Sequence, residues 1–163
     1  MPTRGVIYVH SSPPAVCPHV EWAIGRVLET PVDLHWTAQA AAPSSWRTDH
    51  VWMAEAGTGA ELASALHQWP MLRFEITEDP SPGVDGERIM FVPGRGMYRA
   101  ATSANGDLMV AEDRIRALVA TTTDAEALRH GLSKLLGAEW DNELEPYRFA
   151  GDDSGQHWLS QVS

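Results

Sequence analysis

The chain has 163 residues and a hydrophobic content of 44%, which places it among globular proteins of single-domain size. Its 22 acidic and 12 basic residues give a net charge of −10 with histidine neutral, and such a field argues against nucleic acid as a partner. A single cysteine excludes an internal disulfide, and no segment approaches the roughly 20 apolar residues that span a bilayer, so we expect a cytoplasmic protein without a membrane partner.

The first 29 residues predict a strand, a loop and a helix. Residues 6–9 form a continuous apolar run, which suits a strand covered on both faces. Pro18 has the position that proline prefers in a first helical turn. One apolar stripe follows at helical spacing: Val20, Ala23, Ile24, Val27 and Leu28.

The segment from Pro31 to Glu78 predicts three more strands and a helix. Residues 31–37 alternate as in a half-buried strand, and residues 46–55 predict a second strand in which either face could be the buried one. Residues 58–61 match a capping box, which opens a helix that Pro70 ends. Residues 71–78 alternate again. The resulting order, β-α-β-β-α-β, is that of the ferredoxin-like domains.

A hairpin is predicted next, with strands at 88–92 and 97–102. Asn105 and Gly106 form the strongest tight-turn signal in the chain, because both residues tolerate a positive φ. We therefore expect a two-residue turn there, followed by a short return strand over residues 108–110.

Two helices are expected after this strand. The first covers residues 112–120 and has an ion pair between Glu112 and Arg116 at i,i+4 spacing. The second starts with a capping box at residues 123–126 and ends at Gly137. Its apolar face consists of Leu128, Leu132, Leu135 and Leu136.

These elements predict an α+β fold whose mostly antiparallel sheet has a ferredoxin-like start and is extended by a C-terminal hairpin and two helices. We expect the helices on one face of the sheet, with a mixed sheet covered on both faces as the alternative. Residues 1–137 form a single domain in this prediction. Residues 138–163 form an acidic and aromatic tail that packs on the body or on a partner.

The loop after the first strand is the natural place for a ligand. It leads from a strand end to a helix N-terminus, where free amides favour anions. It contains the candidate ligand residues His10, Ser11, Ser12, Cys17 and His19. In the competing explanation, the serines and prolines simply form a surface loop. A lone cysteine more often packs as a small hydrophobe. The spacing of these residues matches no zinc pattern and no phosphate-binding glycine pattern occurs, so we assign no metal, cofactor or catalytic residue.

The first helix also predicts an interaction surface. Trp22 lies opposite the apolar stripe, with Arg26 nearby and with Gly25 leaving a gap beside it. The tail supplies aromatic side chains that could pack on Trp22 and Gly25, and carboxylates that could pair with Arg26. We therefore predict an interface that combines Trp22, Gly25 and Arg26 with Trp140, Tyr147, Phe149 and Trp158, either within one chain or between two copies.

Four stretches resemble an uncharacterised actinobacterial family, the domain of unknown function family 3145. They are TRGVIYVHSSPPAVCPHVEWAIG, LRFEITEDP, ANGDLMVAEDRIR and LLGAEWDNELEPYRFAGD. The resemblance covers nearly the whole chain. It implies a short, single-domain, intracellular protein of high-GC Gram-positive bacteria, and it supplies no activity and no catalytic residues.

Two functional hypotheses follow. The preferred one is a non-enzymatic binding or regulatory module that acts through contacts with a partner protein or through self-association, because the unusual features are aromatic and acidic. The alternative is a small-molecule enzyme or ligand sensor that uses the loop with Ser11, Ser12, Cys17 and His19. A deep pocket with convergent polar groups at that loop favours the alternative, and an aromatic-lined surface favours the binding module.

Overall fold

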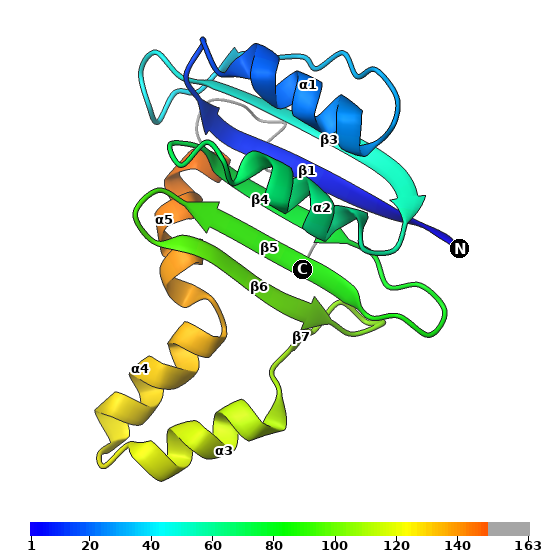
Figure 1. Cartoon of the computed structure of the whole chain (residues 1–163). Helices are drawn as coiled ribbons and strands as arrows, with labels where there is room; N and C mark the ends of the chain where they lie inside the picture. The colour runs from blue at the N-terminus through cyan, green and yellow to red at the C-terminus, as the bar shows by residue number, and fades with distance from the viewer. Residues whose placement is uncertain (150–163) are drawn as a thin grey trace.

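The chain forms an α+β fold with one antiparallel sheet and five helices in the computed structural model, which describes residues 1–149 without the side chain of Phe149 (Figure 1). Trp158 of the predicted interface lies outside the described residues. The strands are β1 (Pro2–Ser12), β2 (Thr37–Ala38), β3 (Trp46–Glu55), β4 (Arg73–Glu78), β5 (Gly86–Val92), β6 (Gly96–Thr102) and β7 (Leu108–Met109). The helices are α1 (Cys17–Val27), α2 (Thr58–Leu66), α3 (Glu112–Thr121), α4 (Ala125–Leu135) and α5 (Ala138–Phe149).

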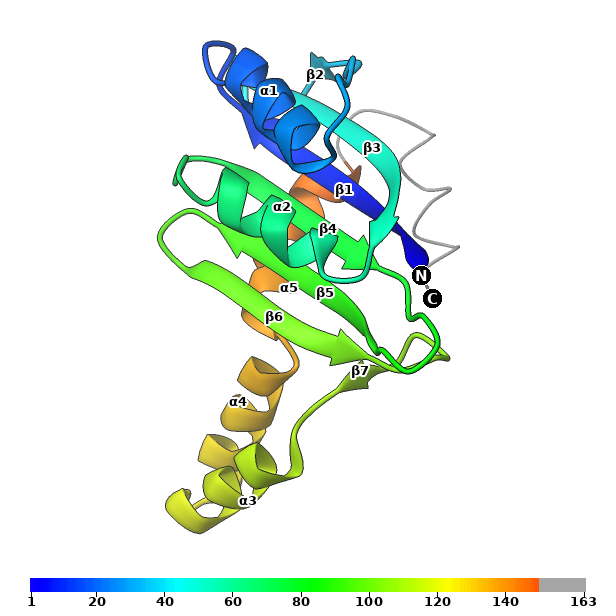
Figure 2. The same cartoon turned by 45° about the vertical axis from the view of Figure 1, so that its right-hand side comes forward.

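The sheet has the strand order β2-β3-β1-β4-β5-β6-β7, and each neighbouring pair is antiparallel. Helices α1 and α2 cover one face and α5 covers the other, whereas α3 and α4 extend away from the sheet (Figures 1 and 2). The prediction that the helices lie on one face is therefore wrong. Helices cover both faces, although the sheet itself is not mixed.

The main core lies between the sheet and the two helices α1 and α2. The apolar stripe of α1 faces this core, as its spacing predicts: Val20, Ala23 and Ile24 are buried in one cluster with Ile7 and Val9 of β1, and Val27 and Leu28 are partly buried against it. A second, smaller cluster lies on the opposite face under α5: Met90, Val92, Tyr98, Trp140 and Leu144. Both faces of the central strands are therefore covered, which explains the continuous apolar run of β1.

The buried face of β3 is the one that carries Trp52, whose side chain is 3% exposed, whereas Val51 and Met53 are exposed. Trp52 lies opposite Gly5 of β1, and a Cβ at Gly5 would lie 2.0 Å from the indole ring. The large ring occupies the space that a side chain at position 5 would need. This pairing selects the face that the pattern of β3 alone left open.

The predicted strand over residues 31–37 is wrong, because only Thr37 and Ala38 pair with β3. The alternation nevertheless identifies the side chains that point inward, since Leu34 is buried and Val32 and Trp36 pack against the main core. The segment follows a strand-like pattern of burial without forming strand hydrogen bonds. Periodicity reports burial and does not show whether a backbone partner is present.

The predicted capping box at Thr58 is also wrong. The carboxylate of Glu78 on β4 accepts hydrogen bonds from the amides of Gly57 and Gly59, at distances of 2.9 to 3.2 Å. The Thr58 hydroxyl donates to the carbonyl of Glu55 instead. A carboxylate from a neighbouring strand thus satisfies the free amides that begin α2.

The turn after β6 differs from the prediction for Asn105 and Gly106. Gly106 has a φ of 86°, but Asn105 does not have a positive φ, and the loop between β6 and β7 covers residues 103–107. The Ser103 amide donates to the Asp107 carbonyl at 2.8 Å, and the Gly106 amide donates to Ser103. The result is a five-residue loop with a single left-handed glycine.

The two predicted C-terminal helices form close to their expected limits. Arg116 and Glu112 pair across one turn of α3, and Gly137 ends α4 with a φ of 76°. The capping residue of α4 is Asp124, whose side chain accepts from the Ala127 amide at 2.8 Å, so the prediction of Thr123 as the cap is wrong by one position. No helix in residues 1–149 is long and apolar enough to cross a bilayer.

Candidate functional site

The residues of the predicted ligand loop, at and after the end of β1, lie on different sides of the sheet. The register of β1 shifts after Val9 against both of its neighbours, as at a β-bulge. His10 and Ser11 contact Glu75 and Arg73 of β4. Ser12 instead contacts Cys17 at the start of α1, where the thiol lies 3.5 Å from the hydroxyl. The five residues therefore do not form one polar site.

His10 belongs to a buried ionic cluster under α5. Its Nε2 hydrogen bonds to the Glu75 carboxylate, and Arg148 of α5 donates to both oxygens of that carboxylate, with a 2.9 Å distance from Nε. The three side chains are at most 7% exposed. Asp141 accepts from Arg148 at 2.9 Å and from Arg88 at 2.8 Å, which extends the cluster to the surface.

The contacts within the ionic cluster stabilise the charged form of Glu75. Burial by itself would raise the pKa of Glu75, but the hydrogen bonds and charges of His10 and Arg148 outweigh it and hold that pKa well below its ordinary value. Burial raises the pKa of Tyr8 to about 12; Asp49 and Glu75 add to this effect, and the charge of Arg4 opposes it. Glu75 and Arg148 are therefore both charged at neutral pH, and the ion pair between them fastens α5 to the sheet.

Two further contacts fasten the end of α5. The buried Gln39 side chain donates to the His10 carbonyl at 2.7 Å and to the Tyr147 carbonyl at 3.1 Å. The guanidinium of Arg73 lies over the Tyr147 ring, 4.4 Å from its centre. At the other end of the helix, the Trp140 indole donates to the Gly96 carbonyl at 3.1 Å. Both Trp140 and Tyr147 therefore contact the body of the chain.

Cys17 is buried at the start of α1. Its thiol contacts the Ser12 hydroxyl and the Pro13 carbonyl, and burial raises the pKa of the thiol above its ordinary value. A protonated thiol is a weak nucleophile. His19 is exposed two residues further along the same turn and lies near the Trp69 ring, with 6.1 Å between the ring centres. These two residues therefore do not pair.

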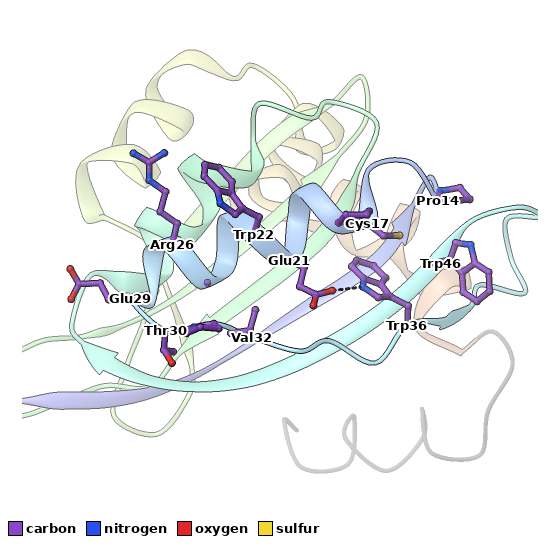
Figure 3. A pocket seen from close by; sticks show the side chains of 13 residues that line it. Pro14, Cys17, Glu21, Trp22, Arg26, Glu29, Thr30, Val32, Trp36 and Trp46 are labelled. Atoms are coloured by element: carbon purple, nitrogen blue, oxygen red, sulfur yellow. Dashed lines mark hydrogen bonds between the residues drawn. The ribbon is translucent and has the colours of Figure 1, made fainter.

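A large groove runs along α1 and is bounded by residues 29–36 and the start of β3 (Figure 3). Its volume is about 1010 Å³. Three tryptophans line it, Trp22, Trp36 and Trp46, together with prolines and Val32. The polar lining comes mainly from charged side chains on and after α1: Glu21, Arg26 and Glu29.

Local contacts shape the groove. The Trp36 indole donates to Glu21 at 3.4 Å, which joins residues 29–36 to α1 (Figure 3). Arg26 lies over the Trp22 ring at 5.3 Å from its centre. A Cβ at Gly25 would lie 3.0 Å from the Thr30 carbonyl, so the glycine permits close approach of this segment to the helix. The backbone beside Gly25 is therefore the one that directly follows α1.

The structure places the predicted interface residues in two regions. Trp22, Gly25 and Arg26 lie along the groove, and the Trp22 side chain is 61% exposed. Trp140 and Tyr147 lie on α5, which covers the opposite face of the sheet. Trp140 and Tyr147 thus do not cover Trp22.

Sequence reasoning missed the centre of the buried cluster. Glu75 occupies an outward position of an alternating strand, which normally indicates a solvated side chain. Arg148 gave the one usable signal, since it is the only lysine or arginine after residue 138. Trp36 and Trp46 were not assigned to a site either, because their shared groove depends on the path of residues 29–36.

The fold and these contacts define an α+β domain with a buried ionic cluster on one face of its sheet and a tryptophan-lined groove on the other. The family model described as "Protein of unknown function (DUF3145)" matches residues 6–161, and the chain belongs to this family. No curated protein and no solved structure matches the chain significantly.

Proposed function

We propose that the protein is a binding module that acts through protein contacts, and that the groove along α1 receives a short extended segment of a partner protein. The segment would carry apolar side chains flanked by basic residues. The tryptophan lining of the groove is the observation that carries this proposal.

The composition of the groove supports a protein partner. Tryptophan is enriched at the centres of protein interfaces, because its large apolar body also carries a hydrogen-bond donor. Trp22 exposes most of its side chain and lines the same groove as Trp36 and Trp46. The ten residues from Cys17 to Arg26 span about 15 Å of helix, which is the length of about five residues of extended chain.

The charge of the chain supports basic flanks on the partner segment. The net charge is −10, and Glu21 and Glu29 lie in the groove. Arg26, the one cation in the lining, lies over the Trp22 ring. A segment with lysine or arginine beside its apolar residues would therefore meet complementary charge.

Peptide selection tests this proposal. A displayed library of random ten-residue peptides is selected on the protein and counter-selected on the double variant Trp22→Ala/Trp36→Ala. We expect enriched peptides that combine apolar and basic residues and bind the double variant at least tenfold more weakly. The variant Met53→Ala, altered at an exposed side chain outside the groove, should bind as the wild type does. No enrichment, or equal binding to the double variant, would contradict the proposal.

The same selection, repeated on a chain that ends at Phe149, separates this partner from the predicted interface with the tail. Peptides that bind the shortened chain but not the full chain would show that residues 150–163 occupy the groove, and the proposal of an external partner would then fail. Equal binding to both chains supports a partner protein.

A small apolar ligand is the second candidate, because the volume of the groove lies at the upper end of ligand pockets and Cys17 contributes to its lining. The polar residues His10 and Ser11 face the other side of the sheet, which weakens this alternative. Fluorescence of anilinonaphthalene sulfonate that is lost in Trp22→Ala/Trp36→Ala, without any peptide enrichment, would favour it.

We also infer that residues 2–78 have the split arrangement of ferredoxin-like domains. The connections support this inference, since α1 joins β1 to β2 with β3 between them, and α2 joins β3 to β4 with β1 between them. The single, unpaired Cys17 supports a reducing cytoplasm as the site of action.

A further inference from the structure

Helices α3 and α4 form a hairpin that extends away from the rest of the molecule (Figures 1 and 2). We call residues 112–136 the helical hairpin. None of its residues is buried, and only five are even partly covered. Helices of 10 and 11 residues are marginal in water unless an apolar face is packed. The hairpin therefore lacks the burial that normally stabilises such helices.

The exposed surface of the helical hairpin is rich in large apolar side chains. Val119 is 59% exposed and Leu136 is 51% exposed, and Ile115 and Leu132 are each more than one third exposed. α4 has a distinct apolar side, as the spacing of its leucines predicts. Several large apolar side chains exposed on one pair of helices indicate an interaction site.

The two helices of the hairpin already pack closely on each other. A Cβ at Gly131 of α4 would lie 2.2 Å from the nearest methyl carbon of Leu118 on α3. The hairpin thus has a defined internal contact, which Leu118 and Gly131 make. Val119 and Leu132 are one residue further along each helix and stay exposed, so they are accessible to a partner.

The charge of the helical hairpin identifies the partner. The hairpin contains four acidic and four basic residues and is neutral, whereas the whole chain carries −10. A basic partner would be drawn to other parts of this surface, and a second copy of the chain would be repelled by them. The neutral hairpin is the place where two copies can meet without that repulsion.

We propose that the helical hairpins of two copies of this chain pack together as a four-helix bundle around a two-fold axis. Such an interface uses the same patch on both copies, so one amphipathic hairpin is sufficient to close it. The bundle would cover Val119, Leu132 and Leu136 of each copy. The groove along α1 would remain open, because α1 lies far from the hairpin in the molecule (Figure 1).

Sedimentation equilibrium of the full chain tests the dimer. We expect twice the chain mass of 17.9 kDa at micromolar concentration, and a fall to 17.9 kDa in the double variant Val119→Asp/Leu132→Asp. Both positions are exposed in the single chain, so its circular dichroism at low temperature should change little. Met53→Asp, which introduces the same charge at another exposed apolar residue, should leave the dimer intact. A monomeric wild type, or a dimeric double variant, would overturn the proposal.

Amide hydrogen exchange of the wild type provides a measurement that needs no variant. Protection of residues 112–136 should increase with protein concentration, whereas protection of β1 and β4 should not. A concentration-independent exchange rate in the helical hairpin would exclude self-association at this surface, and a different partner would then have to cover it.

Discussion

Replacing Glu75 with glutamine should strongly destabilise the fold. The substitution keeps the size and shape of the side chain but removes the charge that faces Arg148. Arg148 is 6% exposed, and donates to both oxygens of Glu75. Removing one partner of a buried ion pair typically costs about 3 to 5 kcal/mol, because the remaining charge stays buried. Asp141 still contacts Arg148 at 2.9 Å, so we expect a loss near 3 kcal/mol.

Urea unfolding at pH 7, followed by circular dichroism, measures this loss as a lower midpoint with an unchanged slope. Glu87→Gln is the matched control, since Glu87 pairs with an Arg99 side chain that is 53% exposed, and exposed pairs contribute little. If the unfolding free energy of Glu75→Gln lies within about 1 kcal/mol of that of the wild type, the buried ion pair does not stabilise the fold.

The dependence on pH has a defined sign. The pKa of Glu75 is lower in the folded state than its ordinary value of 4.5. The unfolded chain therefore binds this proton more readily, so the contribution of Glu75 is fully present above about pH 5 and is lost as the pH falls below that value. The wild type should lose stability from about pH 5 to about pH 3 more steeply than Glu75→Gln does. Parallel pH profiles of the two proteins would contradict this assignment.

Three further predictions concern other parts of the chain. Ending the chain after Gly137 removes Arg148 and Leu144 and uncovers one face of the sheet, so the shortened protein should not unfold cooperatively. A cooperative thermal transition like that of the wild type would refute this. Cys17 should react with a thiol reagent at pH 7 more slowly than a free cysteine, because burial raises its pKa, and rapid labelling of folded protein would refute its packing role. Gly106→Val should cost about 1 kcal/mol or more in urea unfolding, because Gly106 has a φ of 86°, and an unchanged midpoint would refute strain at this turn.

Local patterns in the sequence determine the elements that depend on neighbouring residues. The stripe of α1, the pair of Glu112 and Arg116 and the end of α4 at Gly137 all involve residues within one or two helical turns. Their positions follow from residue spacing within the helix, so the sequence alone predicts them. The α+β class and the family membership follow from the sequence for the same reason, since both are readable along the chain.

Contacts between segments distant in the sequence decided how α2 begins, which face of β3 is buried, and whether residues 31–37 form a strand. The amides that begin α2 bind Glu78, which lies about 20 residues further along, and the buried face of β3 depends on Gly5 of β1. No local pattern contains these partners. The predicted strand over residues 31–37 fails for the same reason, because a strand needs a neighbouring backbone as well as an alternating pattern.

The candidate site was decided almost entirely by the tertiary structure. Glu75 alternates as a solvated residue would, and it becomes buried only because α5 crosses that face and brings Arg148 to it from 73 residues away. The groove likewise requires residues 29–36 to return along α1 and place Trp36 beside Glu21. Residue spacing predicts helices α1 to α4 and the ends of α3 and α4, whereas it does not predict α5. Only the packing of distant segments decided which charged side chains are buried, because the free energy of burying a charge depends on the partner that the fold supplies.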